Sequence, residues 1–529
     1  MKNKRYLTIA LTAALMAGTL PGSAALAAEE GGFTEVSLPL TEEKETLTVW
    51  VKNDVTLMNA CGGDLNNTPF FQELEERTNV HIEWIVPASG TEQEQFNLLM
   101  SSGKLPDIMY TYPNQVYYPD GLDAAVEDGY FLDLTDLLPQ YAPNYLAAIE
   151  KSDEDTKQGV KTDAGRSVLM YSVMQEEQPT FYGYVVRQDW LDELGLSVPV
   201  TYDDWEEMLT QFKETYNAAA PLSINSRFFW NLGIGMGAYA PNDFYQEDGV
   251  VHNALLDDTE AVREFLTLMN RWYQNGLIDP DFASSTAFWG DSVLVTNNNT
   301  GAFLTMYTFP SAIFLPSMEE GASFTAVKTP VKEEGDTLEY GTPVPSTTSA
   351  YAVTTDCENP ELAVSWIDYL FSEEGAMLAN YGVEGETYTL DADGTPVFTE
   401  TITANPDGLT YDEAMRTYLM APSFPVSYYD WKRELQFISE DDFNMCYIWD
   451  DVNHEKYYSS YAAMTVEENA EYSNLFADID TYISENALSF ITGAKSLDEF
   501  DSFIETVKGM GLPRCVELKQ AALDRYNAR

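Results

Sequence analysis

The feature that most restricts the fold of this 529-residue chain is an alternation of short strand-like segments with helix-like segments, which begins near residue 46. The first strands are predicted at 47–51, 80–86 and 107–111, and the first helices at 70–78 and 93–101. This βαβαβ order predicts parallel strands joined by helical crossovers. Because loops of a parallel sheet meet at one edge, loops 52–68 and 112–121 are expected to form one wall of a ligand site.

A second α/β unit is predicted further along the chain. Its strands are expected at 180–187, 300–305 and 323–327, and its helices at 189–194, 201–216 and 259–275. A further strand at 350–355 and a helix at 359–374 follow later in the chain. Thr201 and Asp204 have the spacing of a capping box at a helix start. From Tyr411 onward the sequence is mostly helical. A chain of this length exceeds what one hydrophobic core usually supports, so two or more lobes are expected.

The N-terminal segment has the order of a secretory signal peptide. Lys2, Lys4 and Arg5 precede an apolar run at 6–20, and small residues follow at 24–28. The run is shorter than the roughly 20 residues that a membrane-spanning helix needs, which disfavours a retained anchor. Residues 1–27 are therefore predicted to be removed on export.

The charge of the chain excludes one class of partner. It has 86 acidic residues against 28 Lys and Arg. Nucleic acids and anionic membrane surfaces attract concentrated positive charge, so neither is an expected partner. A uniformly acidic surface mainly serves solubility. An aromatic content of 13% nevertheless indicates a folded chain with many rings available.

The usual signatures of enzymes and metal proteins are missing from the sequence. It contains three His and four Cys, without a C-x-x-C pair, an H-E-x-x-H, a G-x-S-x-G or a phosphate-binding G-x-x-x-x-G-K-[ST]. No catalytic residue, metal site or cofactor is predicted. Export would permit disulfides, but the spacing of the cysteines assigns none.

Several stretches in a fixed order carry a family resemblance. They are LPDI at 105–108, YVVRQDWLDELGL at 184–196, GLIDPDF at 276–282, YGVEGETY at 381–388, FITG at 490–493 and ALDRYN at 522–527. Together they resemble family 1 of the bacterial extracellular solute-binding proteins of ABC importers, particularly its long lipoprotein-like branch. This resemblance implies a two-lobed α/β fold of the periplasmic-binding-protein type, class II, with a hinge that closes on a ligand.

The same resemblance suggests how the chain divides and with what it interacts. Lobe 1 is expected to contain 46–172 plus 346–395, and lobe 2 to contain 173–345 plus 396–529. The family role implies a monomer that captures an oligosaccharide and delivers it to the transmembrane subunits of an ABC permease.

Candidate ligand residues follow from the chemistry of sugars, which have apolar faces and a rim of hydroxyls. Such a ligand needs flat aromatic rings beside carboxylate, amide and guanidinium groups. The candidates expected on cleft loops are Tyr112, Asn114, Trp230, Tyr239, Trp289, Asp291, Tyr307 and Trp431. Neighbouring candidates are Tyr110, Phe229, Asn231, Phe288, Gly290, Phe309 and residues 428–430. Trp230, Trp289 and Trp431 rank first because each lies in an irregular stretch flanked by Asn, Gly or Asp.

One departure from the family bears on metal binding. Many relatives have an acidic loop before a Pro-Leu-Ser sequence, and some bind calcium there. Residues 214–220 supply too few oxygens for a six- to eight-coordinate ion, so no calcium is predicted at this loop. The acidic segments 246–249 and 391–394 are interpreted as turns, because neither continues to the bidentate Glu of an EF-hand.

Two alternative functions remain open at this point. Carboxylates and aromatic rings also suit a cationic peptide or a polyamine. A secreted glycoside hydrolase would need two carboxylates about 5–10 Å apart, which 86 acidic residues permit. Lipoproteins of this branch have a Cys directly after the apolar run, whereas Ala27 and Ala28 here precede Glu29. Ordinary cleavage is therefore predicted, with release to a periplasm or the cell exterior.

Overall fold

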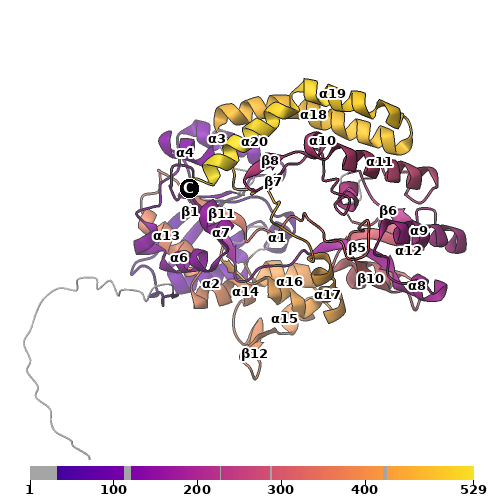
Figure 1. The fold of residues 1–529 in the computed structure, drawn as a ribbon. Helices are drawn as coiled ribbons and strands as arrows, with labels where there is room; N and C mark the ends of the chain where they lie inside the picture. Colours follow the sequence, from indigo (N-terminus) through magenta and orange to yellow (C-terminus); the bar gives the residue numbers. More distant parts are fainter. Residues whose placement is uncertain (1–31, 112–120, 227, 286–288, 421–425) are drawn as a thin grey trace, which may run out of the picture.

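The computed structural model describes residues 32–111, 121–226, 228–285, 289–420 and 426–529. The predicted signal peptide lies outside these residues. Two separate β-sheets organise the described chain, and helices cover both (Figure 1). This two-sheet α/β architecture agrees with the predicted fold class.

The first sheet has six strands in the order β14-β4-β11-β3-β1-β2. Their bounds are β1 Glu45–Trp50, β2 Val80–Ile85, β3 Ile108–Thr111, β4 Leu169–Met174, β11 Thr347–Val353 and β14 Tyr428–Tyr429. β1 pairs with β2 and with β3 in parallel, so the predicted βαβαβ unit is confirmed. Its helices are α2 (Pro69–Thr78) and α3 (Glu92–Ser102). β11 enters between β3 and β4 and is antiparallel to both.

The second sheet has four strands in the order β10-β5-β9-β6. Their bounds are β5 Tyr182–Arg187, β6 Leu222–Ser223, β9 Ala302–Met306 and β10 Phe324–Val327. β5 is antiparallel to both of its neighbours, so its first residue, Tyr182, pairs with Met306 at the end of β9. The start of β5 therefore lies at the sheet edge where β9 and β10 end.

The predicted helices of the second unit are present. α9 (Tyr202–Tyr216) begins with the predicted capping box, in which Thr201 and Asp204 each bond to the backbone of the other. α11 (Thr259–Gln274) packs against the long helix α18 (Val466–Thr492), and α19 (Phe500–Met510) and α20 (Leu512–Tyr526) complete this helical layer (Figure 1).

Each sheet has its own hydrophobic core. Trp50 and Trp366 are fully buried in the first core, and Trp205 and Trp272 in the second. The four cysteines are buried free thiols: Cys61, Cys357, Cys446 and Cys515. In the described part of the chain, no helix is both long and apolar enough to cross a membrane.

The contacts of residues 396–429 favour a different lobe boundary from the one expected from the sequence. α16 (Tyr411–Tyr418) contacts α1 (Val55–Ala60) and α2, and Arg416 forms an ion pair with Asp54. Val426 belongs to the first core, and β14 belongs to the first sheet. We therefore propose that the second segment of lobe 1 continues to about residue 429 instead of 395.

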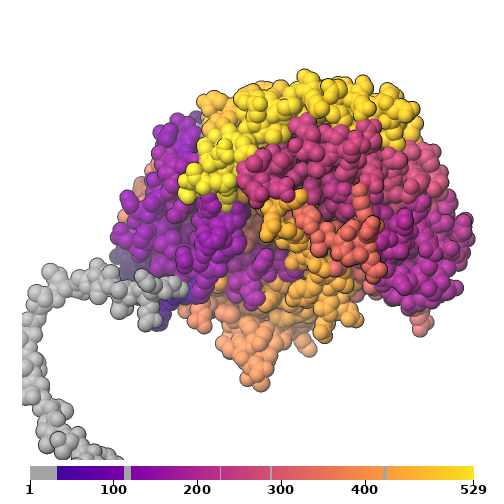
Figure 2. All heavy atoms as spheres, viewed as in Figure 1, coloured from indigo at the N-terminus to yellow at the C-terminus, as the bar shows by residue number. Residues whose placement is uncertain are grey.

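Three crossing segments join the lobes: residues 175–181 between β4 and β5, 328–346 between β10 and β11, and 430–439 after β14. The end of α20 also reaches the first lobe, where the Tyr526 hydroxyl bonds to Asp155. Figure 2 shows this C-terminal layer lying across the second lobe and meeting the first. Arg529 adds an ion pair with Asp163 of the first lobe.

Candidate functional site

The carboxyl ends of β6, β9 and β10 form one edge of the second sheet, together with the start of β5. Ligands of open α/β sheets bind outside the carboxyl ends of strands. Loops at this edge contain Asn225, Phe228, Trp289 and Phe309. A binding site is consequently expected at this edge.

An aromatic group lies at this edge and consists of Tyr182, Phe228, Trp289 and Phe309. The Trp289 ring is stacked parallel to Phe228 at 6.3 Å between centroids. It also contacts Tyr182 at 5.6 Å and, edge-on, Phe309 at 6.3 Å. All four side chains are partly exposed, so ring surface remains available to a ligand.

A cavity of about 140 Å³ adjoins the aromatic group, and we call it the Tyr184 cavity. Its lining includes Thr180, Tyr182–Tyr184 of β5, Trp230 and Asn231 of η2 (Phe229–Gly233), Asp243, Tyr340–Thr342 and Trp449 of α17 (Glu440–Trp449). On the other side of Tyr184, a smaller cavity is lined by Asn225, Phe228, Trp289 and Asp291. Tyr184 thus lines both cavities.

Two polar groups in the Tyr184 cavity have unused bonding capacity. The buried hydroxyl of Tyr184 makes no hydrogen bond with any residue that the structure describes. Asp243 accepts a bond from the Phe244 N–H at 2.8 Å, which leaves its second carboxylate oxygen for another donor. Desolvation by the surrounding atoms raises the pKa of Asp243 above its usual range.

A larger pocket continues from this cavity along the same crossing segments. It has a volume of about 610 Å³ and is lined by residues of 151–156 and 174–177 on the first lobe, 343–346, and Gln246 and 454–461 on the second. We call it the interlobe pocket. Gly341 and Thr342 line the Tyr184 cavity, and the next residues of the same segment, Pro343–Ser346, line the interlobe pocket. Together the cavity and the pocket provide room for more than one unit of a chain-like ligand.

The structure separates the predicted site residues into different environments. Trp289 belongs to the aromatic group, and Asp291 lines the smaller cavity while capping α12 (Ser292–Thr296) through the N–H groups of Val293 and Leu294. Tyr112, Asn114 and Phe288 lie outside the described residues. Trp289 and Asp291 thus lie at the sheet edge, whereas the four remaining candidates that the structure describes lie mainly in the interior.

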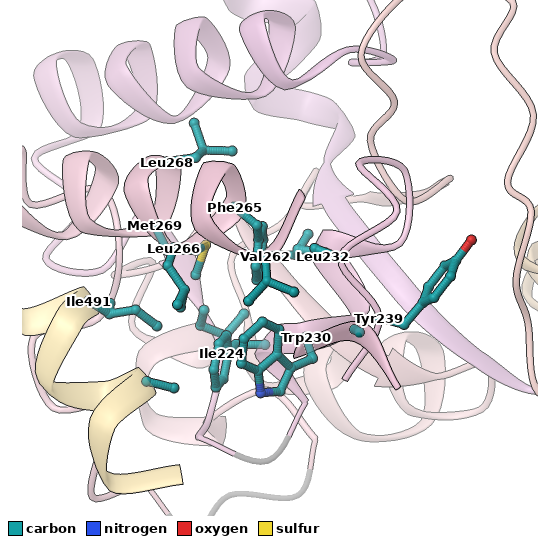
Figure 3. Packing of buried hydrophobic residues seen from close by; sticks show 14 of the residues in the cluster. Ile224, Trp230, Leu232, Tyr239, Val262, Phe265, Leu266, Leu268, Met269 and Ile491 are labelled. Carbon is teal, nitrogen blue, oxygen red and sulfur yellow. The ribbon is translucent and has the colours of Figure 1, made fainter. Parts of the chain in front are cut away.

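Trp230, Tyr239, Tyr307 and Trp431 are mainly packing residues. Trp230 is 6% exposed and packs among Ile224 and side chains of α11, although its edge lines the Tyr184 cavity (Figure 3). Tyr239 packs against Tyr245 and Tyr340. Tyr307 lies in a third apolar cluster with Phe314 and Trp449. Trp431 is 4% exposed, and its indole N–H donates to the Glu176 carbonyl at 3.1 Å.

The residues of this region that were not identified from the sequence include Tyr182, Tyr184, Asn225, Phe228 and Asp243. Both tyrosines lie in a strand that was correctly predicted, but its antiparallel direction places its start, not its end, at the binding edge. Asp243 follows η2 in an irregular loop, where only its position beside a cavity distinguishes it from other acidic residues.

The described residues contain no group of three His, Cys, Asp or Glu side chains arranged to hold a metal ion. The segment 391–394 forms the turn between β12 (Tyr388–Leu390) and β13 (Pro396–Phe398), as predicted. The Asp391 carboxylate there accepts the N–H groups of Asp393 and Thr395 at 2.9 Å each. In segment 246–249, Gln246 and Glu247 belong to β7 (Tyr245–Glu247), and only residues 248–249 form the turn to β8 (Val250–His252).

The two lobes, their crossing segments and the cavities between them define a two-lobed α/β binding protein. The model of the bacterial extracellular solute-binding protein family matches residues 67–377. The chain belongs to this family, which confirms the resemblance found in its sequence motifs.

Two curated relatives are similar over much of their length. Lipoprotein LipO of Bacillus subtilis (strain 168) is 27% identical over 393 residues, which cover 69% of this chain and 72% of that protein. The fructooligosaccharide ABC transporter substrate-binding protein FusA of Streptococcus pneumoniae serotype 4 is 23% identical over 559 aligned residues, with 99% of both chains covered.

Solved structures share the fold. The HMO binding ABC-transporter associated solute binding protein from Bifidobacterium longum infantis ATCC 15697 has a TM-score of 0.73 at 18% identity, covering 91% of this chain and 99% of that one. The alginate-binding protein AlgQ2, in a structure without calcium ion, has a TM-score of 0.66 at 23% identity, covering 92% and 99%. These proteins are named as binding proteins, not as enzymes.

Proposed function

We propose that this protein is the extracytoplasmic substrate-binding component of an ABC importer, that its ligand is an oligosaccharide, and that it delivers this ligand as a monomer to membrane permease subunits. The relatives FusA and AlgQ2, whose names state carbohydrate ligands, support the ligand class. The single observation in this chain that supports it best is the partly exposed aromatic group beside the Tyr184 cavity.

The arrangement suits the chemistry of a sugar. The apolar C–H face of a pyranose or furanose packs on a flat ring, and its hydroxyls need planar polar partners. Trp289 offers the ring, and Asn225, Asn231 and Asp243 offer amide and carboxylate groups around the two cavities. Closure of the lobes would bring the first lobe against the same ligand.

Replacing Trp289 tests the proposal at the ring that contacts the other three members of the aromatic group. Trp289→Ala should weaken oligosaccharide binding by about tenfold or more, since an aromatic anchor at a binding surface typically contributes over 1 kcal/mol. Ligands would first be found by a thermal-shift screen of neutral and acidic oligosaccharides, cationic peptides and polyamines, and affinities then measured by calorimetry.

Tyr447→Ala is the matched control, because Tyr447 is 60% exposed on α17 and lines neither cavity nor the interlobe pocket. The affinity of Tyr447→Ala for the oligosaccharide should equal that of the wild type. Stabilisation by peptides or polyamines alone would contradict a carbohydrate ligand and favour the cationic alternative. Shortened sugar chains in the same samples would instead reveal hydrolysis.

A further inference from the structure

The charges that line the Tyr184 cavity are of one sign. Among the described lining residues, Asp243 is the only ionisable group that is charged near neutral pH, and no Lys, Arg or His is present. A carboxylate on a ligand would therefore meet a like charge and no cation among these lining residues. Like charges placed together at a binding site cost affinity and exclude the wrong ligand.

Lys519 is a cation that interacts electrostatically with Asp243 from outside the cavity lining. The Lys519 ammonium lies over the rings of Tyr458 and Tyr472 at 5.1 Å each and over Phe244 at 5.7 Å. No ion pair within the described chain includes Asp243 or Lys519. Asp243 and Lys519 attract each other, but no hydrogen bond or ion pair within the described chain joins them, so the second carboxylate oxygen of Asp243 remains for a ligand donor.

Tyr184 is a second polar residue of the cavity lining. Its side chain is 2% exposed, it lines the cavity, and its hydroxyl has no partner in the described chain. Buried polar groups in native proteins almost always have hydrogen-bond partners, and an unmade bond costs free energy. The hydroxyl is enclosed by protein atoms, so a ligand could supply this bond only after the surrounding side chains move.

The interlobe pocket extends the same charge pattern. Asp153, Asp155, Glu176, Glu177 and Glu455 line it, against one lysine and one histidine. Any ligand long enough to occupy both spaces therefore remains in an acidic environment along its length.

We propose that Asp243 is a specificity-determining residue: it accepts a hydrogen bond from a hydroxyl or ammonium group of the ligand and excludes sugars that bear carboxylates. The site then selects neutral or amino-bearing oligosaccharides over uronate-containing ones. This inference rests on the proposed function and narrows its ligand class.

A glycan array that displays neutral, amino-bearing and uronate-containing oligosaccharides tests the inference with the full-length mature protein. The wild type should bind neutral or amino glycans about tenfold or more tightly than their uronate counterparts. Asp243→Asn removes the charge and keeps the shape, so it should raise the ratio of uronate to neutral affinity by about tenfold, as removal of one nearby like charge predicts. Calorimetry on the strongest neutral glycan and its uronate counterpart would measure the ratio.

Two further variants serve as controls for the effect of the Asp243 charge. Asp393→Asn, which removes an exposed charge in the β12–β13 turn, should leave the ratio unchanged. Tyr184→Phe removes a hydroxyl and no charge, so it should leave the ratio of uronate to neutral affinity unchanged.

The outcomes separate the two proposals. Wild-type binding of uronates as strong as that of neutral glycans, or an unchanged ratio in Asp243→Asn, would overturn the role of Asp243 and leave the proposed function intact. Binding of cationic peptides with no glycan bound would overturn the proposed function, and the inference would fall with it.

Discussion

Asp368 is a buried carboxyl group whose ionisation should make the stability of the first lobe depend on pH. It is 3% exposed and accepts bonds from the side chain of Asn144 at 2.9 Å and the backbone N–H of Tyr145 at 2.7 Å. Burial raises its pKa to about 7. A carboxyl group in the unfolded chain has a pKa near 4.

The folded state therefore binds the proton of Asp368 more tightly than the unfolded state does. Its contribution to stability is fully present below about pH 4 and is lost as pH rises to about 7. Asp368→Asn cannot ionise, so its melting temperature relative to the wild type should rise between pH 4.5 and 7.5. Thermal unfolding of both proteins across this range would measure the difference, and a constant difference would contradict the prediction.

The direction of individual side chains at the site could not be predicted from the sequence. Trp230 and Trp431 have the same Asn-, Gly- or Asp-rich neighbours as Trp289, but they are 6% and 4% exposed. Flanking residues predict an irregular backbone and do not fix the direction of the side chain. That direction follows from distant elements: α11 packs on Trp230, and Phe443 packs on Trp431.

Among the elements, α18 begins with a capping box that was not predicted. The Thr465 hydroxyl accepts the Glu468 N–H at 3.3 Å, and the Glu468 carboxylate accepts the Thr465 N–H at 2.9 Å. Thr465→Ala should lower the free energy of unfolding by about 1 kcal/mol, the usual cost of losing an N-cap. Chemical denaturation monitored by circular dichroism would measure this loss.

Thr481→Ala is the control within the same helix. Thr481 is exposed, and its hydroxyl bonds to the Ala477 carbonyl one turn earlier. Alanine has the higher helix propensity, so this variant should be neutral or slightly stabilised. Equal destabilisation by both substitutions would show that the N-cap of α18 contributes no more to the free energy of unfolding than an exposed threonine within the helix.

Most elements could be predicted, because helix caps and strand patterns are local. The parallel β1, β2 and β3 and the capping box of α9 are examples. The predicted helix 359–374 instead divides into α13 (Pro360–Tyr369) and α14 (Glu373–Tyr381). Ser372 caps the second helix, and Gly375 approaches the Tyr369 carbonyl so closely that a Cβ atom would lie 1.8 Å from it. Helical periodicity alone does not reveal such a break.

At the scale of the whole molecule, the lobe division depends on contacts between distant segments. The sequence predicted the two-lobed fold, because its motifs run in family order through most of the chain. It did not indicate that β14 would join the first sheet or that α20 would reach the first lobe. Two residues of β14 have no periodicity to detect, and their pairing with β4 links residues about 255 positions apart.

The C-terminal contacts of α20 should hold the second lobe in a fixed position beside the first. Asp163 accepts the Nε–H of Arg525 at 3.2 Å and that of Arg529 at 2.9 Å, so one carboxylate fastens both arginines. Its side chain is 30% exposed, and the two ion pairs are therefore worth only about 1 kcal/mol together.

Asp163→Asn should accordingly increase hydrogen exchange of the backbone amides at 522–529 by about fivefold, because local opening becomes easier by about 1 kcal/mol. Amides of α11, which lie within the second core, should exchange at the wild-type rate and provide the internal control. Mass spectrometry of deuterium uptake resolves both segments. If the C-terminal amides retain their wild-type protection, Tyr526 and its bond to Asp155 hold the tail without the arginines; if α11 also exchanges faster, the loss lies in the stability of the whole lobe and not in the tether.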